Sequence, residues 1–63
     1  MQIPNLIEAL AIIAKQEPEA WVNVGHDEIF IGEYNPEKHT PEDLARLDEL
    51  GWFEDEDAWG HFV

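Results

Sequence analysis

The sequence contains no cysteine, which excludes disulfide bonds and thiolate-based metal or catalytic sites. No apolar run approaches the roughly 18 residues that a membrane-spanning helix needs, so we expect no such helix. The N-terminal residues contain neither a basic segment nor a small-residue cleavage site, and we therefore expect no secretion signal. These three absences favour a reducing, intracellular environment.

The chain also lacks the length for a large core. Its 63 residues predict one domain, spanning residues 1–63. A domain of this size buries only about 60% of the surface that its unfolded chain exposes. Substrate pockets are usually lined by apolar side chains, and here most apolar residues are needed to hold the fold together. We therefore expect a binding protein without a deep cleft, an enzymatic activity or a cofactor.

Basic residues are scarce. The chain has 3 of them against 15 acidic residues, and its formal net charge is −12. A disordered acidic tail would lack the three Trp and three Phe, so the composition predicts a folded body with a negative surface. Such a surface repels nucleic acid and anionic membranes and attracts basic partners. Residues 1–26 carry a net charge of −2 and residues 27–63 one of −10, which places the expected binding surface in the second part.

The first part predicts a helix followed by a β-hairpin. A helical stripe of apolar residues consists of Ile3, Leu6, Ile7, Leu10, Ile13 and Ala14. Pro4 suits the first turn of this helix, and Pro18 ends it near Lys15 or Gln16. Two β-branched and aromatic runs follow within residues 19–32, and they are separated by a turn at Gly25-His26-Asp27. Alternation places Trp21 and Phe30 on the open face, and on the helix-covered face Val22, Val24, Ile29 and Ile31.

The second part repeats that order. Residues 33–39 form a polar connection, after which Thr40 is the expected N-cap and Pro41 the first residue of a helix with a leucine stripe. Gly51 is placed to close this helix in a left-handed conformation. Residues 52–54, an acidic turn at 55–57 and residues 58–63 predict a second hairpin.

The predicted fold class is therefore α+β, with the order α-β-β-α-β-β. Two helices are expected to pack on one face of a small four-stranded sheet that is antiparallel or mixed. This order is a circular permutation of the ferredoxin-like order βαββαβ, which makes that topology a candidate.

Eleven acids form the predicted partner-binding surface. A solvated surface is the commoner explanation for acidic residues, and adaptation to high salt is another. A surface tuned only for solubility usually mixes both signs, with a net charge of magnitude about 2–8. The stronger imbalance here destabilises a small fold by self-repulsion and so indicates a use. The predicted residues are Asp27, Glu28, Glu33, Glu37, Glu42, Asp48, Glu49, Glu54, Asp55, Glu56 and Asp57.

Carboxylates on a rigid fold can imitate a nucleic-acid backbone. Duplex DNA carries about one charge per 1.7 Å of its axis, and carboxylates one helical turn apart are spaced by about 5–6 Å at Cβ. Arg46 follows Glu42 by four residues and interrupts the acidic side of the predicted helix. We therefore rank the acids of the two hairpin turns above those of the helix.

The sequence gives little support for a calcium site or a transition-metal site. Residues 55–57 lack the glycine and the final glutamate of a calcium-binding loop. The three histidines have no i, i+4 spacing, and we expect His26 in a turn, His39 at a helix entry and His61 on a strand. No metal ligand or catalytic residue is therefore predicted.

The aromatic residues allow two interpretations. Trp21 and Phe30 belong either to the core or to an exposed patch on the open sheet face that binds a partner or a second copy. Trp52, Trp59 and Phe62 are expected in the core.

The chain is very short, cysteine-free and acidic, with an expected α+β fold and the segment Leu47-Asp48-Glu49-Leu50-Gly51-Trp52-Phe53. In these features it resembles small phage-encoded anti-CRISPR proteins that inhibit type I CRISPR-Cas complexes. The resemblance covers the whole chain in size, charge and general character, and it carries over no individual site residue. Several such inhibitors imitate DNA and occupy the site that reads the PAM or holds the target strand. The resemblance implies a DNA-mimicking inhibitor that acts in the cytoplasm of a host bacterial cell on a basic Cas effector subunit, as a monomer or homodimer. The alternative is a small interaction module of a phage or mobile element that binds a protein, or itself, through the open aromatic face.

Overall fold

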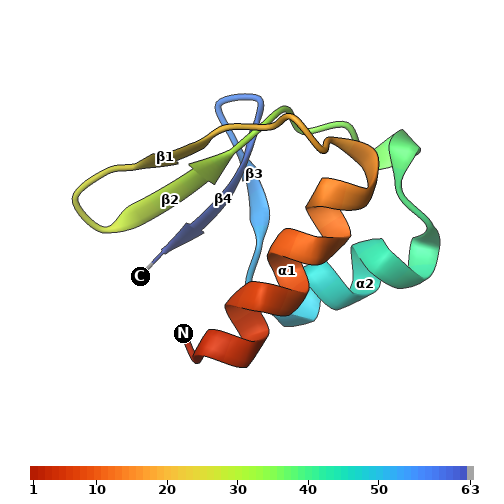
Figure 1. Cartoon of the computed structure of the whole chain (residues 1–63), viewed down its shortest axis with the longest axis horizontal. Coiled ribbons are helices and arrows are strands. Elements are labelled where there is room, and N and C mark those ends of the chain that lie inside the picture. Colours follow the sequence, from red (N-terminus) through yellow and green to blue (C-terminus); the bar gives the residue numbers. More distant parts are fainter. Residues whose placement is uncertain (63) are drawn as a thin grey trace.

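The computed structural model describes residues 1–62, and Val63, which the second predicted hairpin includes, lies outside them. The elements follow the predicted order, with one short 3₁₀ helix added within the polar connection. The fold is α+β, with two helices and a four-stranded sheet (Figure 1). The elements are α1 (Ile3–Gln16), β1 (Val22–Val24), β2 (Glu28–Ile31), η1 (Pro36–Lys38), α2 (Pro41–Glu49), β3 (Phe53–Asp55) and β4 (Ala58–Phe62).

The sheet has the strand order β1-β2-β4-β3, and every neighbouring pair is antiparallel. The last strand of the chain therefore lies between β2 and β3, so that β2 and β4 are the central strands. The mixed alternative does not apply.

Local signals explain where the helices begin and end. The Thr40 hydroxyl accepts a hydrogen bond of 3.1 Å from the Asp43 N–H, which confirms Thr40 as the N-cap of α2. Gly51 has a φ of 90° and closes that helix, while the Trp52 N–H donates to the Leu47 carbonyl at 2.9 Å. The end of α1 at Gln16, two residues before Pro18, confirms the other prediction.

The core lies between the helices and one face of the sheet. Ile31 of β2 is paired with Trp59 of β4, and both side chains are buried on the face that meets the helices. The other buried apolar residues come from α1, from α2 and from the link after α2. They are Ala9, Ile12, Ile13, Leu47 and Trp52.

Two ion pairs join the helices. The Arg46 guanidinium donates to both carboxylate oxygens of Glu8, at 2.6 and 2.9 Å, and the Lys15 ammonium lies 2.6 Å from Asp43. These contacts explain why a basic residue interrupts the acidic side of α2. Two of the three basic residues, Lys15 and Arg46, therefore form ion pairs between the helices.

The helices do not reach over the edge strand β1. Register puts Val22 opposite Ile31 and Val24 opposite Ile29, so the predicted shared face is correct. Nevertheless Val22 and Val24 are 52% and 73% exposed, because the β1–β2 hairpin projects past α1 and α2 (Figure 1). The expectation that these two valines meet the helix is therefore wrong.

The expectation for Phe62 also needs correction. Phe62 is 59% exposed and lies on the open face, because it alternates with the buried Trp59 side of β4. His39 precedes α2 as predicted, and its ring is buried with its plane nearly perpendicular to that of Trp59, at 5.6 Å between ring centroids. Trp52 and Trp59 are buried as predicted, and His26 and His61 lie in a turn and on a strand.

Candidate partner-binding surface

The acids of the two hairpin turns lie at opposite ends of the central ladder. The β1–β2 turn carries Asp27, and Glu28 is paired with Phe62 at the end of β4. The β3–β4 turn carries Glu56 and Asp57 and precedes the other end of β4. Figure 1 shows these two turns well separated along the sheet.

A carboxyl pair connects the two turns across the open face of the sheet. The side chain of Glu28 leans over Gly60 towards Asp55, and the two carboxyl groups lie close together. Asp27 and Glu56 lie close enough to add to the field at Glu28. We call these four residues the acidic ridge: Asp27, Glu28, Asp55 and Glu56.

Gly60 makes room for this pair. It is buried at the centre of β4, between Phe30 and Phe53 in register. A Cβ atom there would lie 2.8 Å from Oε2 of Glu28 and 3.1 Å from Cβ of Asp55. Any larger residue would therefore push the Glu28 side chain off the strand.

The ridge concentrates like charge. The adjacent Asp55 carboxyl group, desolvation and the other neighbouring carboxylates raise the pKa of Glu28 to about 7. The opposite case is Glu8, whose pKa is lowered by its hydrogen bonds to the Arg46 guanidinium. The neighbouring carboxylates therefore favour protonation of Glu28, whereas the Arg46 contact favours the ionised form of Glu8.

The β3–β4 turn has unfavourable turn chemistry. Glu56 and Asp57 have φ values of 51° and 65°, as in the two-residue type I′ turns that favour Asn-Gly. A left-handed conformation costs a residue such as glutamate about 1–2 kcal/mol, whereas aspartate tolerates it better but less well than glycine. Two adjacent acids therefore occupy positions where other residues would fold better.

Four of the remaining predicted acids are spread over three places. Glu33 lies beside the β3–β4 turn, because the Tyr34 N–H donates to the Asp57 carbonyl at 2.8 Å. Glu49 lies 3.8 Å from Arg46, and Glu42 is exposed in the first turn of α2. Glu37 is exposed in η1, away from the ridge strands. The structure thus joins some of the predicted residues but does not form one patch from all of them.

Most acids have no basic partner. Ion pairs within 4 Å involve Glu8, Asp43 and Glu49, and they use Lys15 and Arg46. Within residues 1–62, the other twelve acids and Lys38 form no such pair. The surface is therefore left with nearly all of its negative charge uncompensated.

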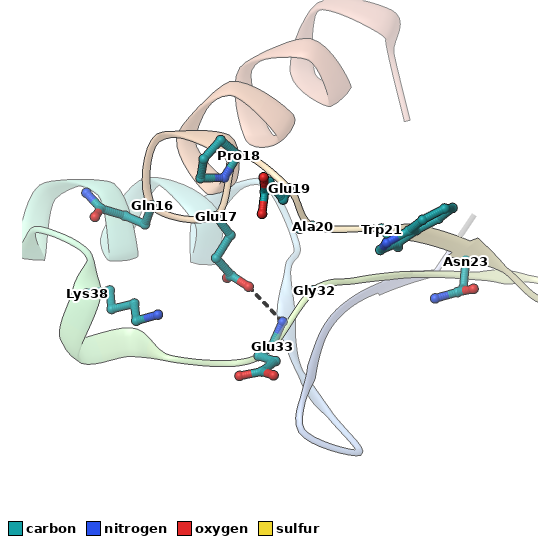
Figure 2. A pocket seen from close by; sticks show the side chains of 10 residues that line it. All are labelled: Gln16, Glu17, Pro18, Glu19, Ala20, Trp21, Asn23, Gly32, Glu33 and Lys38. Atoms are coloured by element: carbon teal, nitrogen blue, oxygen red, sulfur yellow. Dashed lines mark hydrogen bonds between the residues drawn. The ribbon is translucent and has the colours of Figure 1, made fainter.

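A hollow of about 710 Å³ opens beside the end of α1 (Figure 2). The Glu17 carboxylate accepts a hydrogen bond of 2.9 Å from the Glu33 N–H and fits against Gly32, whose φ is 54°. Figure 2 shows Lys38 on the other side of this hollow and the Trp21 ring directed away from Glu17. Glu17 was not predicted, since it lies in the weakly charged part of the sequence. A hollow of this size was not expected either.

A smaller hollow of about 270 Å³ lies between η1, α2 and β3–β4. Its walls include four aromatic residues and two of the predicted acids, which come from α2 and from β3. These residues are Tyr34, Trp52, Phe53 and Trp59, with Asp48 and Glu54. The sequence placed the indoles in a core and the acids on a surface, but it did not bring them together.

Residues 1–62 contain no group of three or more His, Asp or Glu side chains that could hold a metal ion, and no helix that is long and apolar enough to cross a membrane. Comparisons with protein-family models, with curated proteins and with solved structures also found no match to this chain.

Proposed function

We propose that this protein is a DNA-mimicking inhibitor, which presents its acidic ridge and β3–β4 turn to the basic nucleic-acid-binding site of a host complex. Its most concrete form is an anti-CRISPR protein that blocks a subunit of a type I CRISPR-Cas effector in the bacterial cytoplasm. The observation that carries the proposal is the internal use of Lys15 and Arg46, which leaves twelve acids without a basic partner within the described chain. The proposal assigns the chain no catalytic role.

The charge density supports this function. A net charge of −12 over a longest extent of 30 Å amounts to about one charge per 2.5 Å. Duplex DNA carries about one per 1.7 Å. A groove lined by lysine and arginine therefore meets a comparable field on a much smaller body.

The turn chemistry supports it as well. Glu56 and Asp57 adopt left-handed conformations at an energetic cost, and Glu28 and Asp55 lie against each other although both are acids. Folding alone favours Asn-Gly in that turn and an uncharged partner for Glu28. A selected use for the negative charge explains why acids occupy these positions.

The test reverses the turn charges. The triple variant Asp55→Lys, Glu56→Lys and Asp57→Lys is compared with Glu19→Lys, Glu37→Lys and Glu42→Lys, which changes the net charge equally away from the ridge. Binding to a purified type I effector is measured for both by biolayer interferometry, and folding by circular dichroism. We expect the turn variant to lose at least about 100-fold in affinity, since several charge contacts act together. Equal losses of affinity in both variants would show that binding depends on the overall net charge and not on the ridge and the β3–β4 turn.

One observation favours a second function, that of an interaction module without mimicry. The open sheet face carries Phe30 and the neighbouring rings of Phe53 and Phe62, whose centroids are 5.2 Å apart, and Trp21 is 81% exposed. Such a patch fits a protein partner or a second copy of the chain. In that case Phe62→Ser abolishes binding and salt has little effect, as measured by analytical ultracentrifugation.

A further inference from the structure

The smaller hollow combines aromatic walls with acids. The Tyr34 and Trp59 rings meet at 60°, with 4.6 Å between centroids, and form a corner. Trp52 and Trp59 are each 3% exposed, whereas Asp48 and Glu54 are exposed. The carboxylates therefore lie nearer the solvent than the indoles do, at positions where they meet an entering group first.

Within residues 1–62, no lysine or arginine lines this hollow. Neither Asp48 nor Glu54 has a basic group within 4 Å in the described residues. The larger hollow differs in this respect, since Lys38 shares it with three glutamates. Only the smaller one offers aromatic faces and carboxylates without an internal counter-ion.

We propose that this hollow binds the guanidinium group of an arginine side chain supplied by the basic partner. A cation is attracted to the face of an aromatic ring, and arginine is found there more often than lysine. The planar guanidinium can stack in the Tyr34–Trp59 corner while its N–H groups donate to Asp48 and Glu54. A volume of about 270 Å³ is below the usual range for whole small-molecule ligands and suits a single side chain.

The identity of the arginine as part of a protein partner rests on the proposed function, but recognition of the guanidinium does not. Free N-acetyl-L-arginine amide is therefore the probe, titrated into ¹⁵N-labelled protein and followed by NMR. The indole N–H groups of Trp52 and Trp59 are buried and have no acceptor within the described residues, so they report directly on this hollow. The indole of Trp21, which lines the larger hollow, is an internal reference.

We expect saturable shifts of the Trp52 and Trp59 indole signals and little change at Trp21. The neutral isostere N-acetyl-L-citrulline amide should cause no saturable shift, and N-acetyl-L-lysine amide should bind more weakly. Asp48→Asn with Glu54→Gln should weaken arginine binding about three- to tenfold, the range of two exposed ion pairs. The matched variant Glu37→Gln with Glu42→Gln removes the same charge outside the hollow and should bind normally.

Several outcomes would overturn the inference: equal binding of citrulline, tighter binding of lysine, equal losses in the two double variants, or shifts confined to Trp21. These results would not affect the charge-reversal test of residues 55–57, which addresses the proposed function separately. Conversely, a protein that binds no nucleic-acid-binding complex but still recognises free arginine would retain the hollow and lose the proposed function.

Discussion

Acidic residues have basic partners on the helix side of the sheet but not in the carboxyl pair on its open side. On the helix side, Glu8 and Asp43 are paired with Arg46 and Lys15, and those contacts join α1 to α2 over an apolar core. On the open side, Glu28 and Asp55 lie against each other, and the adjoining turn places two acids in left-handed conformations. The helix side is therefore organised for stability, whereas the open side retains charge at the expense of stability.

The largest effect is expected where the helix side is deepest. Leu47 is fully buried between α2 and the sheet, so Leu47→Ala should lower the free energy of unfolding by about 2–5 kcal/mol. In a domain this small, such a loss can prevent folding. Urea denaturation followed by tryptophan fluorescence measures it. Ile7→Ala, at a residue 61% exposed on α1, is the control and should cost far less.

The next prediction tests why residue 60 is a glycine: to leave space for the Glu28 carboxyl group, or because the strand backbone requires it. Gly60→Ala should destabilise the fold by about 1 kcal/mol, because the new Cβ displaces the flexible end of the Glu28 side chain and lies 3.1 Å from Cβ of Asp55. In the double variant Gly60→Ala with Glu28→Ala, the obstructing carboxyl group is gone, and most of the loss should be recovered. If the double variant is as unstable as the sum of the two single changes, the strand backbone and not the carboxyl group requires the glycine.

A smaller change should improve folding and impair binding. Glu56→Asn with Asp57→Gly gives the β3–β4 turn its preferred residues and should raise stability by about 0.4–1 kcal/mol. The same variant loses two acids and should bind the target more weakly. Thermal unfolding and binding assays check the two halves of this prediction. Greater stability with unchanged binding would show that Glu56 and Asp57 do not contribute to binding of the target.

A further prediction concerns pH. The pKa of Glu28 is raised from 4.5 to about 7 by the adjacent carboxyl group of Asp55, so between these values the folded state binds a proton that the unfolded state has lost. Stability should therefore fall as the pH rises from about 4.5 through about 7, and then level off. Glu28→Gln should flatten this fall and be more stable than the native chain at pH 8. Denaturation midpoints at several pH values provide the measurement.

Glu37→Gln is the control for that pH series, since it removes an exposed acid outside the ridge. A fall in stability that is as steep in Glu28→Gln as in the native protein would show that another group carries the pH dependence.

The parts of the fold that depend on local chemistry could be predicted from the sequence. Thr40, Pro41 and Gly51 define α2 through contacts within a few residues, and the turn at residues 25–27 defines the first hairpin. The extent of helix coverage could not be predicted, because it depends on how α1 packs. The alternation of the sequence therefore predicted the face of Val22 and Val24 correctly but not their exposure.

The candidate site shows the same division. Composition indicated an acidic surface in residues 27–63, and that required no three-dimensional information. The contact between Glu28 and Asp55 spans 27 positions and exists because β4 lies between β2 and β3 with a glycine at its centre. The hollow at Tyr34 and Trp59 likewise joins segments that only tertiary packing brings together.

The most direct test of DNA mimicry is an equilibrium competition between this protein and duplex DNA for a purified type I effector complex, repeated at several salt concentrations. We predict one-for-one displacement of the DNA, with the logarithm of the inhibitor's affinity falling in proportion to the logarithm of the salt concentration. Simultaneous binding of DNA and protein, or an affinity indifferent to salt, would contradict mimicry and direct attention to the aromatic face of the sheet.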